Sequence, residues 1–143
     1  MEIDRRANEL LGQTLIGNLG YHGLDGYPKV VPVWFDWTRD EVQVASPPGA
    51  YKSRALARDP RAVLTVSTPE APYHVVSVTG KVRIDVMEES RRIGVVAALA
   101  ERYLGPEGGR KYMSTWLRGG HPGPGDLLRL IPERVRYTNV SGE

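Results

Sequence analysis

The chain has 143 residues and a formal net charge of +2 at pH 7, which suits one domain that buries about two-thirds of its unfolded surface. The absence of cysteine excludes disulfides, thiolate metal ligands and cysteine nucleophiles, and the small basic excess does not favour nucleic-acid binding. No apolar run approaches the ~20 residues of a membrane span, and the N-terminus has no signal-peptide core. We therefore expect one soluble, cytoplasmic domain over residues 1–143 that binds neither membranes nor nucleic acid.

The first half of the chain has the pattern of a short helix followed by strands. Ile3, Ala7, Leu10 and Leu11 share one helical face, and this helix should end at Gly12. Strands are predicted, in chain order, over residues 14–21, 29–37, 41–46, 61–68 and 73–87. The segment 29–37 is apolar on both faces, which is typical of a barrel wall that is covered on its outer side.

The predicted strand 73–87 shows the clearest alternation of apolar and polar residues. Gly80 lies in its middle and would let the strand bend, as a barrel requires. One face is predicted to be core and carries His74, Val76, Val78, Val82, Ile84 and Val86.

The second half of the chain is predicted to contain a long helix and one more strand. Glu88 and Glu89 supply negative charge where the helix should start, and Gly105-Pro106 should stop it. A further short helix is predicted over residues 110–117, a loop over 119–126 and a last strand over 127–140. The whole order predicts an α+β fold, mainly β, in which about six antiparallel strands close into a small barrel with flanking helices.

The segment 46–54 has the composition of an anion-binding turn. A strand ends at Ser46, two prolines and Gly49 turn the chain, and a helix containing Lys52 and Arg54 begins. Backbone amides and cationic side chains therefore converge at one place. A basic turn that serves only solubility is the alternative.

Several kinds of site are not supported by the motifs present. The three histidines, His22, His74 and His121, have no metal-ligand spacing, so no metal is expected. There is no nucleophile elbow, Rossmann fingerprint or Walker loop. An anion clamp beside a flat apolar strand remains, and flavins and deazaflavins fit that combination.

Three segments together resemble the pyridoxamine 5'-phosphate oxidase-like superfamily. They are residues 30–35 (VVPVWF), 52–64 (KSRALARDPRAVL) and 76–82 (VSVTGKV). Within that superfamily the chain is most similar to the flavin/deazaflavin oxidoreductases that use coenzyme F420. The resemblance implies a split β-barrel homodimer that binds two cofactors in grooves between its subunits.

The resemblance also implies which residues would bind the cofactor. Val31, Pro32 and Val33 would run along the deazaflavin ring, and Ser46 would lie near the ring or the ribityl chain. Lys52 and Arg54, with Ser53 between them, would hold the phosphate. The partner subunit would complete the site, and its candidate residues are Trp116, His121 and Arg134.

The resemblance further implies an oxidoreductase activity. Reduced coenzyme F420 would pass a hydride to an electron-poor small organic acceptor, whose identity stays open, and no catalytic residue is assigned. The alternatives are an FMN-dependent oxidase or reductase of the same fold, or a non-catalytic protein that binds and sequesters the deazaflavin.

Overall fold

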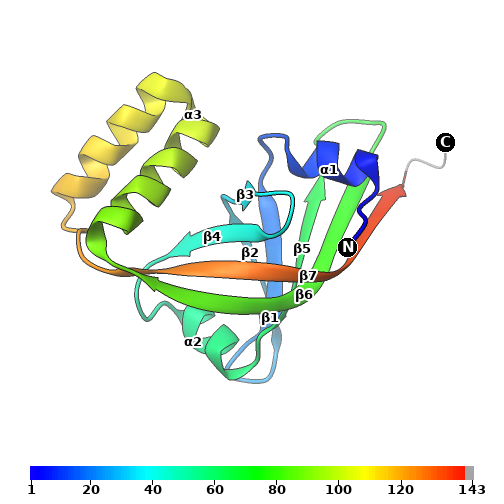
Figure 1. The fold of residues 1–143 in the computed structure, drawn as a ribbon, viewed down its shortest axis with the longest axis horizontal. Coiled ribbons are helices and arrows are strands. Elements are labelled where there is room, and N and C mark those ends of the chain that lie inside the picture. Colours follow the sequence, from blue (N-terminus) through cyan, green and yellow to red (C-terminus); the bar gives the residue numbers. More distant parts are fainter. Residues whose placement is uncertain (141–143) are drawn as a thin grey trace.

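The computed structural model describes residues 1–140, so residues 141–143 of the predicted domain lie outside the described part. Seven strands form one antiparallel sheet in the order β2-β1-β5-β6-β7-β4-β3, and three helices accompany it (Figure 1). The elements are α1 (Arg5–Leu11), β1 (Gly17–His22), β2 (Pro28–Val33), β3 (Asp36–Trp37), β4 (Val42–Ser46), α2 (Tyr51–Arg58), β5 (Arg61–Ser67), β6 (His74–Met87), α3 (Glu89–Arg118) and β7 (Gly125–Asn139).

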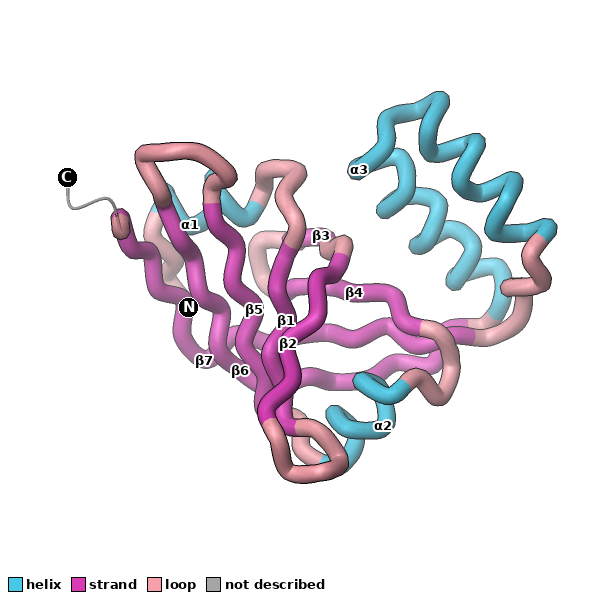
Figure 2. Tube along the Cα trace, turned by 180° about the vertical axis from the view of Figure 1, so that it is seen from behind, coloured by secondary structure: helices cyan, strands magenta, loops and turns pink. Residues whose placement is uncertain are grey.

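The sheet curls into an open, split barrel, which confirms the predicted fold class. The long, bent strands β6 and β7 belong to both halves of the barrel, with β5, β1 and β2 on one side and β4 and β3 on the other (Figure 2). Within the described residues β2 and β3 are not paired with each other, so the barrel is not closed as the sequence led us to expect. There are seven strands because the predicted strand 29–37 is interrupted after Val33 and divides into β2 and β3.

The bend of β6 and β7 is centred on Gly80, as predicted. Thr79 pairs with Arg134 but Gly80 pairs with Pro132, so Glu133 is an extra residue in a β-bulge. A Cβ atom at position 80 would lie 1.9 Å from the carbonyl oxygen of Ile131. Only glycine therefore permits this close approach of the two strands.

The predicted inner face of β6 is wrong at one residue, Val86. Val86 is 76% exposed, whereas the next residue, Met87, is fully buried. Val86 pairs with Asp126 at the end of β6 and β7 that extends beyond the main core cluster. Alternation predicts an inner face only along the part of a strand that the core covers.

The first helix, α1, ends at Leu11 with Gly12 as its C-cap, as predicted, and buries Ala7, Leu10 and Leu11 in the core. Its Asn8 side chain accepts a hydrogen bond from the indole nitrogen of Trp37 at 3.0 Å. This helix therefore covers one end of the barrel (Figures 1 and 2).

The long helix α3 is a hairpin of two arms. Gly105 has φ +78° and ψ 173°, which breaks the helix at the predicted stop and separates a first arm (residues 89–104) from a second arm (residues 106–118). Both arms stand beside the barrel next to β4 (Figure 1). The Tyr103 hydroxyl attaches the first arm to the barrel, because it donates to the Leu15 carbonyl at 2.8 Å and accepts from the Phe35 amide at 3.1 Å.

Candidate functional site

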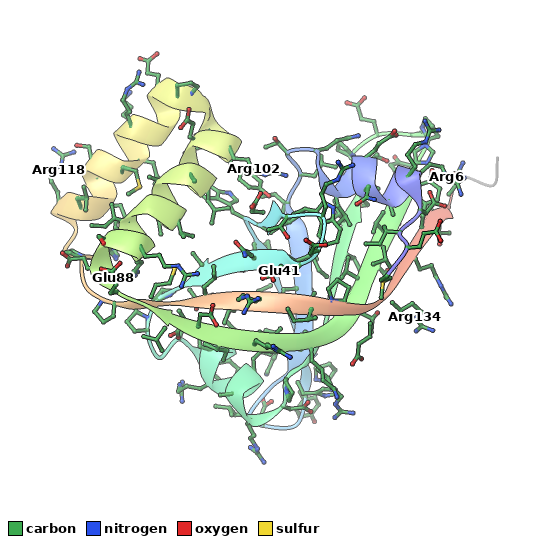
Figure 3. The ribbon with its side chains drawn as sticks, viewed as in Figure 1. Arg6, Glu41, Glu88, Arg102, Arg118 and Arg134 are labelled. Carbon is green, nitrogen blue, oxygen red and sulfur yellow. The ribbon has the colours of Figure 1, made fainter. Side chains whose placement is uncertain are left out.

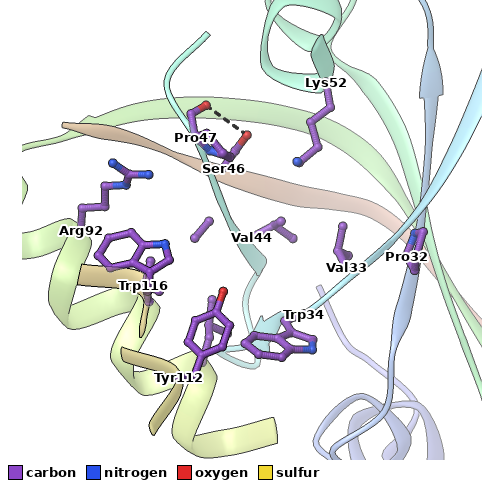
Figure 4. Close-up of a pocket in the computed structure, with 13 residues that line it drawn as sticks. Pro32, Val33, Trp34, Val44, Ser46, Pro47, Lys52, Arg92, Tyr112 and Trp116 are labelled. Atoms are coloured by element: carbon purple, nitrogen blue, oxygen red, sulfur yellow. Dashed lines mark hydrogen bonds between the residues drawn. The ribbon is translucent and has the colours of Figure 1, made fainter. Parts of the chain in front are cut away.

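A pocket of about 270 Å³ lies between the barrel and the α3 hairpin (Figure 4). The barrel supplies the residues of one wall and α3 supplies the other wall. The lining residues are Pro32, Val33, Trp34, Val44, Ala45, Ser46, Pro47, Lys52, Arg92, Val96, Leu99, Tyr112 and Trp116. The predicted site residues Pro32, Val33, Ser46, Lys52 and Trp116 are therefore brought together.

The barrel wall of the pocket is apolar because of where two strands end. Pro32 and Val33 close β2, which is an edge strand, so the missing amide hydrogen of Pro32 costs no ladder bond on its free side. Val44 and Ser46 belong to β4, which ends at Ser46. Val31, by contrast, packs against the hydrophobic core and does not line the pocket.

Helix α2 begins immediately beside this wall. Gly49 has φ +68°, which turns the chain after the two prolines, and the N-cap residue Ala50 has no side chain that can accept from the first-turn amides. Lys52 follows in the first turn and extends into the pocket (Figure 4). These free amides and the ammonium group together can bind an anion.

Lys52 is a half-buried cation without a counter-ion. Burial lowers the pKa of its ammonium group below the usual 10.5, and no carboxylate within residues 1–140 forms an ion pair with it. A desolvated charge of this kind is costly in the empty protein. An anionic ligand would remove that cost.

Ser46 and Ser53 hold α2 against the end of β4. Both side chains are buried, and their hydroxyl oxygens are 3.0 Å apart in a hydrogen bond. Ser53 is thus turned toward the barrel and does not line the pocket, whereas Ser46 does. The pair sets the position of the helix turn that carries Lys52.

Arg54 points in a different direction from Lys52. Residues two apart on a helix are separated by about 200° around its axis. The Arg54 side chain is exposed, donates to the Gly49 carbonyl at 3.2 Å and lies 5.7 Å from the centre of the Tyr51 ring. It does not line the pocket.

The α3 wall contributes Arg92, which the sequence analysis did not identify. This side chain is only 6% exposed and lines the pocket. One terminal nitrogen, Nη1, donates to the carbonyls of His121 and Pro124 at 2.7 and 3.1 Å. Its position on the same helical face as Val96 and Leu99 was the available signal, because a charged residue in an apolar stripe is unusual.

Aromatic rings line both walls of the pocket, with Trp34 on the barrel side and Tyr112 and Trp116 on α3. Trp34 stacks on Tyr103 with ring centres 5.2 Å apart and is tilted against Tyr112 at the same distance. The Arg92 guanidinium lies 5.1 Å from the Trp116 ring centre, and the His121 ring stacks on Trp116 with ring centres 5.4 Å apart. These planar groups can accommodate a flat ring.

The three residues that we expected from a partner subunit lie in different places in this chain. Trp116 lines the pocket of its own chain. His121 is exposed and does not line it, although its ring contacts Trp116. Arg134 is exposed beside the bend of β7, far from α3 (Figure 3).

The charged residues that line the pocket are all positive. Its 13 lining residues include two cations, Lys52 and Arg92, and no aspartate or glutamate. They extend from α2 and α3, on different sides of the pocket (Figure 4). The pocket therefore favours an anionic ligand with a flat, apolar part.

The sequence over residues 3–139 matches the family described as pyridoxamine 5'-phosphate oxidase. The chain belongs to this family. Its sequence comparison with curated proteins gave no match. The predicted membership of this group is therefore confirmed by a match that covers nearly the whole chain.

Solved structures that share this fold include proteins with different names and ligands. An F420 reductase is 21% identical, with a TM-score of 0.73 over 94% of this chain and 98% of that one. A conserved hypothetical protein from Mycobacterium tuberculosis is 20% identical, with a TM-score of 0.73 over 97% and 86%. A FAD-binding protein from Mesorhizobium loti is 20% identical, with a TM-score of 0.61 over 94% of each chain. These likenesses show the fold.

Two further kinds of feature are absent from the part of the chain that the structure describes. No group of three or more histidine, aspartate or glutamate residues could hold a metal ion there. No helix there is long and apolar enough to cross a membrane.

Proposed function

We propose that this protein is an oxidoreductase that uses coenzyme F420 to reduce an electron-poor small organic acceptor. The observation that carries the proposal is the pocket between β2, β4, α2 and α3, which combines a flat apolar wall with the unpaired cation of Lys52. A deazaflavin has the matching parts, a flat ring and a phosphate-bearing tail. The similarity of the fold to that of an F420 reductase supports the same choice.

The lining residues fit such a cofactor group by group. Pro32 and Val33 would contact one face of the ring, and Trp34 would lie at its edge. The Lys52 ammonium and the uncapped amides of the first turn of α2 would bind the tail phosphate. The ring would occupy the β2 and α2 side of the pocket, and the rest of the tail would extend out past α2.

The chain's own contribution to the reaction is binding, orientation and exclusion of water. The bound deazaflavin would supply the hydride from its ring carbon. The apolar side chains of Val33, Val44 and Leu99 would keep water from the ring, and no charged side chain is needed to form a covalent intermediate. Tyr112 also lines the pocket, and its hydroxyl is a candidate to hold a proton for the acceptor.

FMN is the alternative cofactor, because it shares the flat ring and the phosphate that the pocket favours. The similarity of the fold to that of a FAD-binding protein supports keeping it open. A protein of the same fold that sequesters the deazaflavin without turnover is the remaining alternative.

A homodimer is part of the proposal. On the outer face of the sheet, Val30 is 69% exposed and pairs with Gly20, which also pairs with Val63 of β5. Exposed apolar surface on a sheet is a common basis for association. Light scattering should give the mass of a dimer, and Val30→Lys should convert it to monomer. A wild-type monomer at all micromolar concentrations would contradict this part.

Titration of the purified protein with coenzyme F420 and with FMN tests the choice of cofactor. Quenching of deazaflavin fluorescence with a micromolar dissociation constant, and FMN binding at least about 10-fold weaker, is expected. Micromolar FMN binding without deazaflavin quenching would favour the alternative. Tight F420 binding without turnover of quinone, nitro-compound and enone acceptors would favour the sequestering protein.

A further inference from the structure

We propose that Arg92 is the specificity residue for the acceptor and that it binds a carboxylate on that molecule. This inference rests on the proposed function, because it assigns the α3 side of the pocket to the acceptor once the cofactor occupies the β2 and α2 side.

The Arg92 guanidinium is buried without a carboxylate partner. Within residues 1–140 its hydrogen bonds all leave from Nη1, to the carbonyl oxygens of His121, Gly123 and Pro124 at 2.7, 3.5 and 3.1 Å. Carbonyl groups satisfy the donors of one nitrogen but do not neutralise the charge. A buried charge without a counter-ion is costly, so a site of this kind is best explained by an anionic ligand.

The remaining donors of Arg92 are free to meet that ligand. Nε and Nη2 make no hydrogen bond to any described residue, and neither is a buried, unsatisfied atom. Because the side chain lines the pocket, water reaches these donors in the empty protein. A guanidinium that uses only one of its nitrogens leaves donors for the planar oxygens of a carboxylate.

The surroundings hold the guanidinium in this orientation. It lies 5.1 Å from the centre of the Trp116 ring, which makes a cation–π contact (Figure 4). The side chain also packs against Gly125, where a Cβ atom would be 2.4 Å from Nε. The loop supplies the carbonyls, and the glycine makes room for Nε. The orientation of Arg92 is therefore fixed by its surroundings, unlike that of an exposed surface arginine.

The two cations of the pocket then have separate ligands. Lys52 lies beside the first turn of α2, which suits a phosphate, and Arg92 lies on α3 over an indole ring, which suits a planar carboxylate attached to an aromatic or conjugated group. Such a group is also electron-withdrawing when conjugated with a double bond. The proposed acceptor class is therefore the unsaturated or aromatic carboxylates.

Equilibrium binding of benzoate and of its neutral isostere benzamide tests the proposal without turnover. Both probes are titrated into the protein, with and without F420, and followed by calorimetry and by intrinsic tryptophan fluorescence. Benzoate should bind at least about 10-fold more tightly than benzamide, and Arg92→Met should weaken benzoate binding roughly 10- to 100-fold while changing F420 affinity by less than about threefold. The exposed neighbour Arg91 provides the control, because Arg91→Met should change neither the affinity for benzoate nor the affinity for F420.

A second variant keeps the test decisive if Arg92→Met fails to fold. Gly125→Ala retains both cations but places a Cβ atom against Nε, so it should weaken benzoate binding and leave F420 binding unchanged. Equal binding of benzoate and benzamide, or a loss of F420 affinity in Arg92→Met with benzoate unchanged, would overturn the proposal. Benzoate binding that needs Arg92 in a protein that binds no F420 would support this inference and reject the proposed cofactor.

Discussion

The hydroxyl oxygens of Ser46 and Ser53 lie 3.0 Å apart in a buried hydrogen bond that joins the end of β4 to the first turn of α2. Ser46 also lines the pocket, and Lys52 immediately precedes Ser53. The bond therefore connects the stability of the fold to the position of the pocket's cation.

The two single removals of these hydroxyls should together lower the free energy of unfolding by more than the removal of both at once. Ser46→Ala leaves the buried Ser53 hydroxyl unpaired, and Ser53→Ala leaves the Ser46 hydroxyl with only its 3.4 Å bond to the Pro47 carbonyl. Each variant should lower the free energy of unfolding by about 1–2 kcal/mol. The double variant should lose clearly less than the sum. Urea denaturation measures all three, with the exposed Ser67→Ala as a control that changes stability by less than about 0.5 kcal/mol. Strictly additive losses would contradict the assigned bond.

The Tyr103 hydroxyl should matter for stability, whereas the Tyr112 hydroxyl should not. Tyr103 donates to the Leu15 carbonyl and accepts from the Phe35 amide, so Tyr103→Phe leaves both groups unpaired and should cost about 1–3 kcal/mol. The Tyr112 hydroxyl has no hydrogen bond to the described residues, and Tyr112→Phe should change the unfolding free energy by less than about 0.5 kcal/mol. Similar losses in the two variants would show that Tyr103 does not attach α3 to the barrel.

Lys52 should lower the stability of the ligand-free protein at neutral pH. Its pKa in the folded protein is below the unfolded value of 10.5, so between these two pKa values the unfolded chain binds more protons and stability rises with pH. Lys52→Met should therefore be more stable than wild type at pH 7, and the difference should shrink as pH rises toward 10.5. Urea denaturation from pH 7 to the alkaline range checks this. A variant that is less stable than wild type at pH 7 would contradict the buried, unpaired charge.

The pair of Glu41 and Arg129 should stabilise the fold above acidic pH. Two hydrogen bonds of 2.7 and 2.8 Å from Arg129 hold the pKa of the Glu41 carboxyl below its usual 4.5. This contribution is present above pH 4.5 and is lost as pH falls through the lowered pKa.

Glu41→Gln should accordingly reduce the unfolding free energy by about 1 kcal/mol at pH 7, with the difference from wild type disappearing in strong acid. Glu9→Gln is the matched control, because the exposed Arg5–Glu9 pair is 4.0 Å apart and should contribute nothing measurable. A pH-independent difference for Glu41→Gln would indicate lost packing and not a lost ion pair.

Strand patterns and helix stops predicted most of the fold because they reflect local chemistry. Alternation located β4, β5 and β6, and Gly105-Pro106 marked the break in α3. The open barrel and the division of segment 29–37 depend on which strands pair across the sheet, which local pattern does not contain. Val86 was misplaced for the same reason, since it lies beyond the part of β6 that the core covers.

The candidate site was predicted less completely than the fold. Lys52 and Arg54 are equivalent in charge, and only the helix geometry separates the one in the pocket from the one in solvent. The sequence did not identify Arg92, because its role depends on a loop that follows much later in the chain. The carbonyls that it binds belong to residues 29 and 32 positions further on. Contacts of that range follow from the tertiary fold.

The dissociation constant of coenzyme F420 for Lys52→Met and Arg54→Met, measured beside wild type, tests the central claim most directly. The account predicts that Lys52→Met weakens binding roughly 10- to 100-fold, the effect of losing one charge-assisted contact, while Arg54→Met stays within about twofold of wild type. Unchanged affinity in Lys52→Met, or an equal loss in Arg54→Met, would contradict the placement of the cofactor in this pocket.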